Sequence, residues 1–168
     1  MAAVWYTHLV KKRIIVSDSM VLELSEVGEY IIELAKPDVE ISINGRFVAS
    51  GIDQKQLRVT IHHRAPRTVA RTSLRGTSND QAKLSFFGRI IIDPNCPQTN
   101  SFLEERILLL SPNARGETVP ELEILSDDVK CSHAATISTI DPEQLFYLQS
   151  RGLTFDQAEK MLVASFLQ

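Results

Sequence analysis

The sequence predicts a mainly β protein that ends in a small pair of helices. Up to about residue 140, the apolar residues come in short runs rich in Val and Ile, which favour strands over helices. Turn-forming residues separate these runs, for example at Lys36-Pro37-Asp38 and Ser111-Pro112-Asn113. After Ile140 the apolar residues change to helical spacing. We therefore expect a strand-rich core over residues 1–140 and a helical tail over residues 141–168.

The apolar runs predict roughly ten short strands. In Val39-Glu40-Ile41-Ser42-Ile43 every second residue is apolar, as a half-buried strand requires. Asn44-Gly45 is the strongest hairpin signal in the chain. The spacing of the runs fits a sandwich, a barrel or a β-solenoid, and no clear internal repeat decides among them. The expected strands cover residues 14–16, 20–24, 30–34, 39–43, 47–49, 57–61, 84–92, 107–110, 119–125 and 129–137.

The first helix of the tail is bounded by residues typical of helix ends. Asp141 is a suitable N-cap, and Pro142 suits the first helical position. The helix is expected to run from Glu143 to Arg151. Gly152 is then the natural residue to end it.

The second helix has a similar beginning. Thr154 is expected to be its N-cap, with Gln157 three positions later to complete a capping box. Two helices this short are not stable alone in water, so their apolar faces must pack on the β core or on a partner. The apolar face of the second helix contains Phe155, Ala158, Met161, Leu162, Ser165 and Phe166.

The composition excludes several classes of protein. With 43% hydrophobic and 23% charged residues, the chain is typical of a soluble globular domain. The formal net charge of -3 argues against a general affinity for nucleic acid or for an anionic membrane. No apolar run approaches the roughly 20 residues of a membrane span. The N-terminal segment lacks the pattern of a secretory signal, and two cysteines favour a reducing, cytoplasmic compartment.

Cys131 and His133 form the most specific candidate site. Residues two apart on a strand point to the same face, so the thiol and the imidazole could bind one soft metal or pair with each other. The alternative is a buried cysteine and a hydrogen-bonded histidine with only a packing role. A metal site usually needs about four ligands, so two residues would leave it incomplete.

Other reactive residues suggest no self-contained chemistry. Five arginines without an intervening acid occupy the stretch from Arg58 to Arg75, and we expect them to pair with acids on neighbouring strands rather than with nucleic acid. Cys96 lies in a turn between prolines and is expected to be accessible. Glu104-Glu105-Arg106 is expected to face solvent. The chain has no phosphate loop and no hydrolase or zinc-protease motif, so we do not expect an enzyme.

From about Leu57 onward, roughly two thirds of the chain resembles the SufB/SufD family of iron–sulfur cluster assembly scaffolds, and its SufD-like side in particular. The densest block of resemblance begins at Asp127 and includes Cys131 and His133, and a second block runs from Gln144 to Leu153. Further matching segments are Arg71-Thr72-Ser73-Leu74-Arg75-Gly76, Ala82-Lys83-Leu84-Ser85-Phe86-Phe87-Gly88-Arg89-Ile90, Leu108-Leu109-Leu110-Ser111 and Pro120-Glu121-Leu122-Glu123-Ile124.

The resemblance implies a right-handed parallel β-helix, that is a β-solenoid, followed by the helical pair. It implies a scaffold that dimerises through the β-helix with a second copy or a SufB-like paralogue. Cys131 and His133 would then be shared ligands of a transient iron–sulfur cluster, with no cluster required in the isolated chain. The tail would dock a SufC-like ABC-type ATPase. The residues expected to dock it are Leu145, Phe146, Leu148, Phe155, Met161, Leu162 and Phe166.

The chain is much shorter than typical members of that family, which is expected of a minimal SufD-like protein, of a fragment or of a member that has lost cluster assembly. Two alternative functions stay open. One is a structural β-solenoid interaction module that has lost cluster assembly. The other is an enzyme that depends on Cys131, which would require a thiol of depressed pKa. The resemblance also implies a cytoplasmic location, or the plastid stroma if the protein is eukaryotic and processed.

Overall fold

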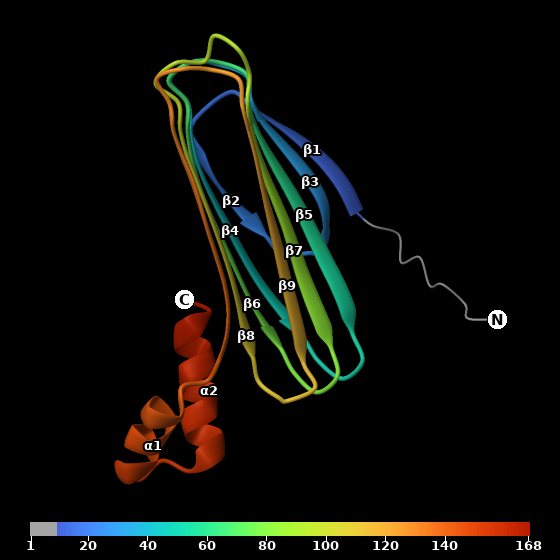
Figure 1. Ribbon diagram of the computed structural model, residues 1–168, viewed down its shortest axis with the longest axis vertical. Coiled ribbons are helices and arrows are strands. Elements are labelled where there is room, and N and C mark those ends of the chain that lie inside the picture. Colours follow the sequence, from blue (N-terminus) through green and yellow to red (C-terminus); the bar gives the residue numbers. More distant parts are fainter. Residues whose placement is uncertain (1–9) are drawn as a thin grey trace, which may run out of the picture.

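Ten strands and two helices make up the computed structural model of the protein, which describes residues 10–168 (Figure 1). The prediction that the N-terminus is not a secretory signal falls largely on residues 1–9, outside the described part. The strands are β1 (Val10–Val16), β2 (Met20–Leu24), β3 (Gly28–Leu34), β4 (Glu40–Ala49), β5 (Gln54–His63), β6 (Val69–Ser78), β7 (Lys83–Ile92), β8 (Asn100–Leu109), β9 (Arg115–Ile124) and β10 (Lys130–Thr139). The helices are α1 (Pro142–Ser150) and α2 (Phe155–Phe166).

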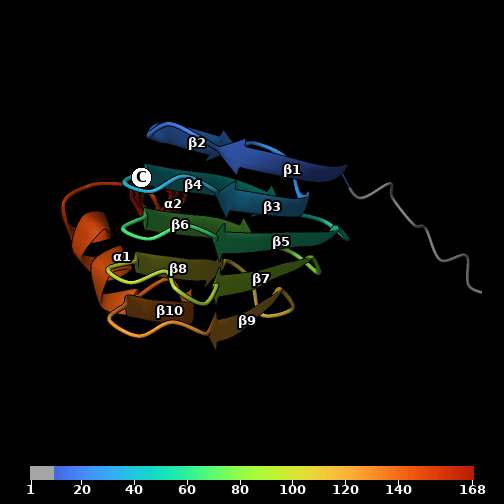
Figure 2. The same cartoon turned by 90° about the horizontal axis from the view of Figure 1, so that it is seen from above.

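The strands form two parallel sheets that face each other (Figure 2). One sheet has the order β1-β3-β5-β7-β9, and the other has the order β10-β8-β6-β4-β2. Each turn of the coil therefore contributes one strand to each sheet, which confirms the predicted β-solenoid with its C-terminal helix pair. The right-handed sense of the coil stays a prediction of the resemblance.

The repeat of the coil is about 30 residues. Val69 pairs with Glu40, 29 positions earlier, and Asn100 pairs with Val69, 31 positions earlier. In-register stacking places like positions above one another between the sheets. One such column is Ile32, Ile61 and Ile90, all fully buried. Burial of these columns supplies the main stabilising contribution, at roughly 25 cal/mol per Å² of apolar surface.

The predicted hairpin at Asn44-Gly45 is wrong, because these residues lie inside the continuous strand β4. Gly45 faces the interior, where a Cβ atom would lie 2.7 Å from the ring of Phe47 and 3.0 Å from Leu74. The glycine therefore serves close packing in the core, where the sequence pattern suggested a turn.

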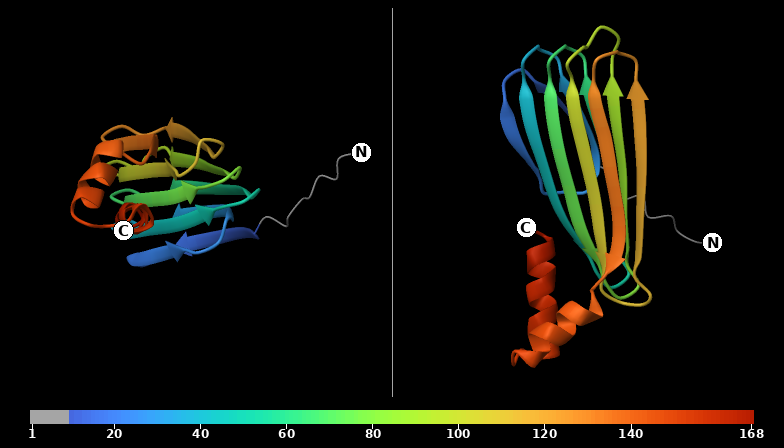
Figure 3. Two further views of the ribbon diagram at one scale, coloured as in Figure 1. Left: turned by 90° about the horizontal axis from the view of Figure 1, so that it is seen from below. Right: turned by 60° about the vertical axis from the view of Figure 1, so that its left-hand side comes forward.

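The tail helices begin and end close to the predicted residues. The Asp141 side chain accepts a hydrogen bond from the backbone N–H of Glu143, at 2.8 Å. Thr154 and Gln157 form the complete capping box that begins α2. Gly152, with φ of 95°, makes the left-handed turn between the helices. Both helices lie outside the sheet that contains β4, β6 and β8 (Figure 3). No helix among residues 10–168 is long and apolar enough to cross a membrane.

Candidate half-site at the end of the solenoid

Cys131 and His133 lie on β10, the edge strand of its sheet. Both side chains point inward, as the two-residue spacing predicts. Cys131 stacks in register on Ser101, and His133 stacks on Leu103 in the turn beneath. Cys131 packs against the core, and the His133 side chain is only 8% exposed. Both side chains therefore lie at the end of the coil, and among the described residues no further turn stacks on this strand.

Burial keeps both groups in their uncharged forms. It raises the pKa of the Cys131 thiol and lowers the pKa of the His133 imidazole. A raised thiol pKa is the opposite of what a cysteine nucleophile requires, so it counts against the alternative of a Cys131-dependent enzyme. Neutral imidazole, in contrast, is the form of histidine that binds metals.

Glu105 is the residue of this region that sequence reasoning missed. We expected Glu104-Glu105-Arg106 to face solvent, but Glu105 on β8 is fully buried. The signal was present in the alternation of Leu103, Glu105 and Ile107, since every second residue of a strand shares one face. Leu103 and Ile107 are also fully buried, so the strand period places Glu105 between them in the interior.

Glu105 and His133 meet inside the last two turns. Glu105 Oε2 lies 3.3 Å from His133 Nε2, but the two atoms are not aligned as a hydrogen bond. Neither carboxylate oxygen of Glu105 nor Nε2 of His133 has any hydrogen-bond partner. Burial raises the pKa of Glu105 to about 7 and lowers that of His133, so the contact is a pair of orphaned groups rather than a salt bridge.

These donors fit half of a cluster site. A thiol and an imidazole are the ligand types that iron–sulfur centres use, and an orphaned buried Nε2 is free to take a partner. Within residues 10–168, however, no group of three or more His, Cys, Asp or Glu side chains converges to hold a metal ion. The predicted ligands Cys131 and His133 would therefore form only part of a donor set.

The end of the coil beside these donors is apolar. Leu122, Ile124 and Ile137 occupy interior positions of the last turn, yet their exposed fractions lie between 42% and 47%. In the turn beneath, their ladder partners are fully buried, namely Ile90, Ile92 and Ile107. The last turn thus exposes side chains whose ladder partners in the turn beneath are covered.

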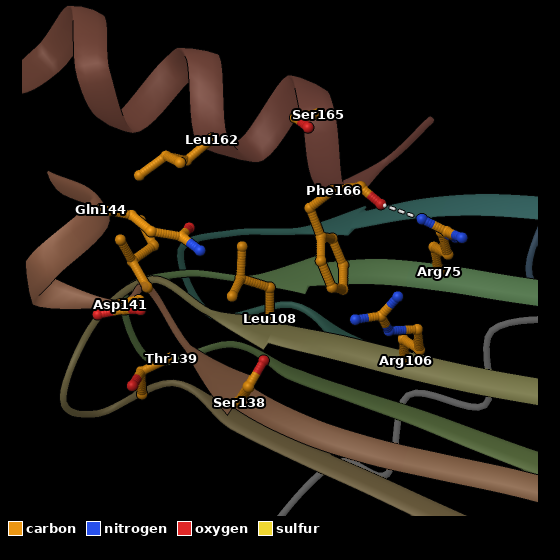
Figure 4. A pocket seen from close by; sticks show the side chains of 11 residues that line it. Arg75, Arg106, Leu108, Ser138, Thr139, Asp141, Gln144, Leu162, Ser165 and Phe166 are labelled. Atoms are coloured by element: carbon orange, nitrogen blue, oxygen red, sulfur yellow. Dashed lines mark hydrogen bonds between the residues drawn. The ribbon is translucent and has the colours of Figure 1, made fainter. Parts of the chain in front are cut away.

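Some apolar residues of the tail pack on the sheet, and others are exposed to solvent. Phe166 lies against the sheet between Arg75 and Arg106 (Figure 4). The Arg106 guanidinium lies 5.5 Å from the centre of its ring, and Arg75 Nη1 donates to the Phe166 carbonyl at 2.9 Å. The other predicted docking residues are half-buried, namely Leu145, Leu148 and Leu162, or exposed, namely Phe146, Phe155 and Met161.

The arginine stretch pairs with acids, as predicted. Stacking of the turns brings four of the five arginines beside an acid of a neighbouring strand or turn. The fifth, Arg58, stacks on the Phe87 ring, with its guanidinium 4.1 Å from the ring centre. The pairs, with their N–O distances, are Arg64–Glu33 at 3.1 Å, Arg67–Asp38 at 2.6 Å, Arg71–Glu40 at 4.0 Å and Arg75–Glu104 at 3.6 Å.

Cys96 is not accessible, contrary to expectation. Its exposed fraction is 2%, because the turn between the prolines folds inward onto the core. Its Sγ lies 3.9 Å from the carbonyl oxygen of His63, and its backbone N–H donates to Ser126. Burial raises the pKa of the Cys96 thiol, which makes it a structural residue.

Comparison with known proteins agrees with this architecture. Residues 14–166 match the family described as "SUF system FeS cluster assembly, SufBD core domain". The iron-sulfur cluster assembly protein SufD of Escherichia coli is 40% identical over 88 residues, which cover 52% of this chain and 21% of that protein.

Two further relatives differ in coverage. The chloroplastic protein ABCI7 of Arabidopsis thaliana is 43% identical over 81 residues, which cover 48% of this chain and 17% of that protein. An iron-sulfur cluster assembly SufBD family protein of Mycobacterium leprae is 32% identical over 149 residues, which cover 76% of this chain and 38% of that protein. The chain thus aligns with about a fifth of the first two relatives and with more of the third.

Proposed function

This chain belongs to the SufBD core domain family of the SUF iron–sulfur cluster assembly system, and we propose that it acts as a scaffold component of cluster assembly and not as an enzyme. The observation that carries the proposal is the position of Cys131 and His133 on the last strand of the coil. There, an incomplete set of donors adjoins an apolar end that lacks a covering layer. A partner at that end would bring the missing ligands.

The partner is a second SufBD-type solenoid, either another copy of this chain or a SufB-like paralogue. Its coil would cover Leu122, Ile124 and Ile137, whose counterparts in the turn beneath are fully buried. Burial of a large apolar side chain at such a contact contributes about 1.5–3 kcal/mol. The cluster is the transient cargo of the interface, and an isolated chain need not hold one.

The exposed face of the tail is the docking surface for a SufC-like ABC-type ATPase. Phe146, Phe155 and Met161 are at least half exposed, while Phe166 holds α2 on the sheet. This arrangement suits a tail that packs on the sheet with one face and binds the ATPase with the other.

The double substitution Phe146→Ala with Met161→Ala should weaken ATPase binding in calorimetry, and unchanged binding would contradict this part of the proposal.

Reconstitution of an iron–sulfur cluster with the partner tests the role of the donors. The wild-type complex should develop a sulfide-to-iron charge-transfer band, and Cys131→Ala and His133→Ala should each abolish most of it. Cys96→Ala is the matched control, because that thiol is buried against the carbonyl oxygen of His63, and its loss should leave the band intact. A full-strength band in both site variants would contradict the assignment and would favour a structural solenoid module that has lost cluster assembly.

The reducing cytoplasm, or the plastid stroma in a plant, is the compartment that suits this role. Both cysteines are free thiols, and one relative is a chloroplastic protein. Thiols that must receive sulfur or iron have to stay reduced, which an oxidising compartment would prevent.

A further inference from the structure

Glu105 is a buried carboxylate for which the fold supplies no counter-charge. The contrast with Glu33, the other buried glutamate, is informative. Glu33 bonds to Arg13 at 2.7 Å and to Arg64 at 3.1 Å. Among residues 10–168, no arginine or lysine pairs with Glu105, and neither of its oxygens accepts a hydrogen bond. A buried group of this kind costs several kcal/mol unless an ion or a proton satisfies it.

The interior is shaped to hold the Glu105 carboxylate in place. Gly88 on the opposite sheet faces it, and a Cβ atom at Gly88 would lie 2.6 Å from Glu105 Oε1. Any larger residue at that position would push the carboxylate away. The Oε2 atom is consequently held toward His133 on the last strand, across the open end of the coil.

The separation of the two orphaned atoms matches a shared metal ligand set. Bonds of about 2.0–2.1 Å from a tetrahedral metal place two ligand atoms about 3.3 Å apart. Glu105 Oε2 and His133 Nε2 are 3.3 Å apart and are not aligned for a hydrogen bond. Carboxylate oxygen with imidazole nitrogen suits a borderline divalent cation such as Fe²⁺, Co²⁺ or Zn²⁺.

We propose that Glu105 Oε2 and His133 Nε2 form a two-donor seat for a divalent cation at the end of the solenoid. The proposal deepens the proposed function, on which the choice of iron as the natural cation rests. Because no third ligand side chain of the described residues converges on this position, water or the partner completes the coordination. Glu105 thereby adds a third donor to a chain in which the sequence revealed two.

Titration of the full chain with Co²⁺ alone tests the seat, because four-coordinate Co²⁺ absorbs visible light and calorimetry gives its affinity. The wild-type chain should bind Co²⁺ with a tetrahedral absorption band. Glu105→Gln should weaken this binding by about tenfold or more, as loss of a supporting ligand group does. Glu104→Gln is the matched control, since Glu104 is the outward-facing neighbour on the same strand, and it should bind Co²⁺ like the wild type.

Equal Co²⁺ affinity in the wild type and in Glu105→Gln would overturn the proposal, as would a wild-type chain that binds no Co²⁺ at His133. Circular dichroism of each variant shows whether it is folded; Glu105→Gln should fold, because it removes an unsatisfied charge without changing the shape of the side chain.

Cluster reconstitution with the partner separates this proposal from the proposed function. If Co²⁺ binding ignores Glu105 while reconstitution still requires Cys131 and His133, only the two-donor seat fails. If Co²⁺ binding needs Glu105 but reconstitution needs neither Cys131 nor His133, only the assembly role fails.

Discussion

His63 and Glu105 are buried titratable side chains whose pKa values move in opposite directions. Burial lowers the pKa of His63 to about 4, so its stabilising contribution is complete above the ordinary value of 6.5 and is lost as the pH falls toward 4. Burial raises the pKa of Glu105 to about 7, so its contribution is complete below 4.5 and is lost as the pH rises through 7. Between these limits the two effects oppose each other.

We therefore expect the contributions of His63 and Glu105 to the free energy of unfolding largely to cancel between pH 7 and pH 5, while the lowered pKa of His133 acts alike in the wild type and in the His63 variant. His63→Gln removes one effect, so its stability should rise on acidification by roughly 2 kcal/mol. Glu105→Gln removes the other, so its stability should fall by a similar amount over the same range. Urea denaturation at several pH values measures both slopes relative to the wild type, and the double variant should follow the wild-type profile. Parallel profiles for the two single variants would contradict the assignment.

Gly88 should be intolerant of even one added methyl group. Gly88→Ala would press a Cβ atom against Leu103 and against Glu105 Oε1, and overpacking of this kind costs about 1–3 kcal/mol. Gly116→Ala is a graded control, because its nearest neighbour, Ile107, would be 3.0 Å away. Urea denaturation should show a larger loss of stability for Gly88→Ala than for Gly116→Ala, and the reverse order would contradict this account of the interior.

At the scale of elements, the strongest local feature is the attachment of α2 to the outer face of the sheet. Arg46 Nε donates to the Leu167 carbonyl at 2.6 Å, and Arg75 donates to the Phe166 carbonyl. Cations at a helix C-terminus satisfy its last carbonyls and complement its dipole. The ring of Phe166 supplies the apolar part of the same contact.

Phe166→Ala should therefore release α2 without unfolding the coil. Amide hydrogen exchange in α2 should accelerate by about tenfold or more, which corresponds to a loss of roughly 1.4 kcal/mol or more of local stability. Amides of β5 and β7 should keep their protection. Phe155→Ala is the control, because that ring is half exposed and has little contact to lose. Equal acceleration in both variants would show that Phe166 is not the anchor.

The strands were predictable from the sequence to the extent that their apolar residues alternate. Most of the predicted runs fall within strands, and the tail helices begin and end within about a residue of their expected positions. Strand β6 was missed because its inward positions include Ala70, Thr72 and Gly76, which are small or polar. Side chains of β6 still alternate between the interior and the outer face, but the sequence shows no matching alternation of apolar and polar residues.

The repeat was not visible in the sequence because stacked positions of successive turns need only fill the interior together. The residue type at such a position can therefore change from one turn to the next. Phe47 stacks under Gly76, and Gly76 under Ile107, so a large residue in one turn faces a small one in the next. Complementary packing of this kind erases self-similarity from the sequence.

The candidate site was half predictable for a related reason. Cys131 and His133 follow from spacing within one strand, while Glu105 reaches His133 across turns, which only the ladder register brings together.

At the scale of the whole molecule, the open end of the coil should control association. Ile137→Lys places a charge on the exposed apolar end, where Ile137 is 43% exposed. The variant should fold normally, but its association with the partner solenoid should weaken by about tenfold or more, because a charge at the centre of an interface is costly to desolvate. Sedimentation or calorimetry measures the change. Val48→Lys is the control, because Val48 is an exposed apolar residue on the outer face, and it should associate normally. Equal weakening in both variants would count against the end face.

Because successive turns stack in one direction, the strands of each turn pair only with those of the turns directly before and after it. Such a chain of nearest neighbours opens from its ends, where a turn has one neighbour instead of two. The last turn carries Cys131 and His133, so fraying of β10 separates them from Glu105. A partner that covers this turn supplies the missing neighbour, and its binding free energy then stabilises the arrangement of the donors. Assembly of the complex and ordering of the donors are for this reason thermodynamically linked: whatever favours one favours the other by the same amount.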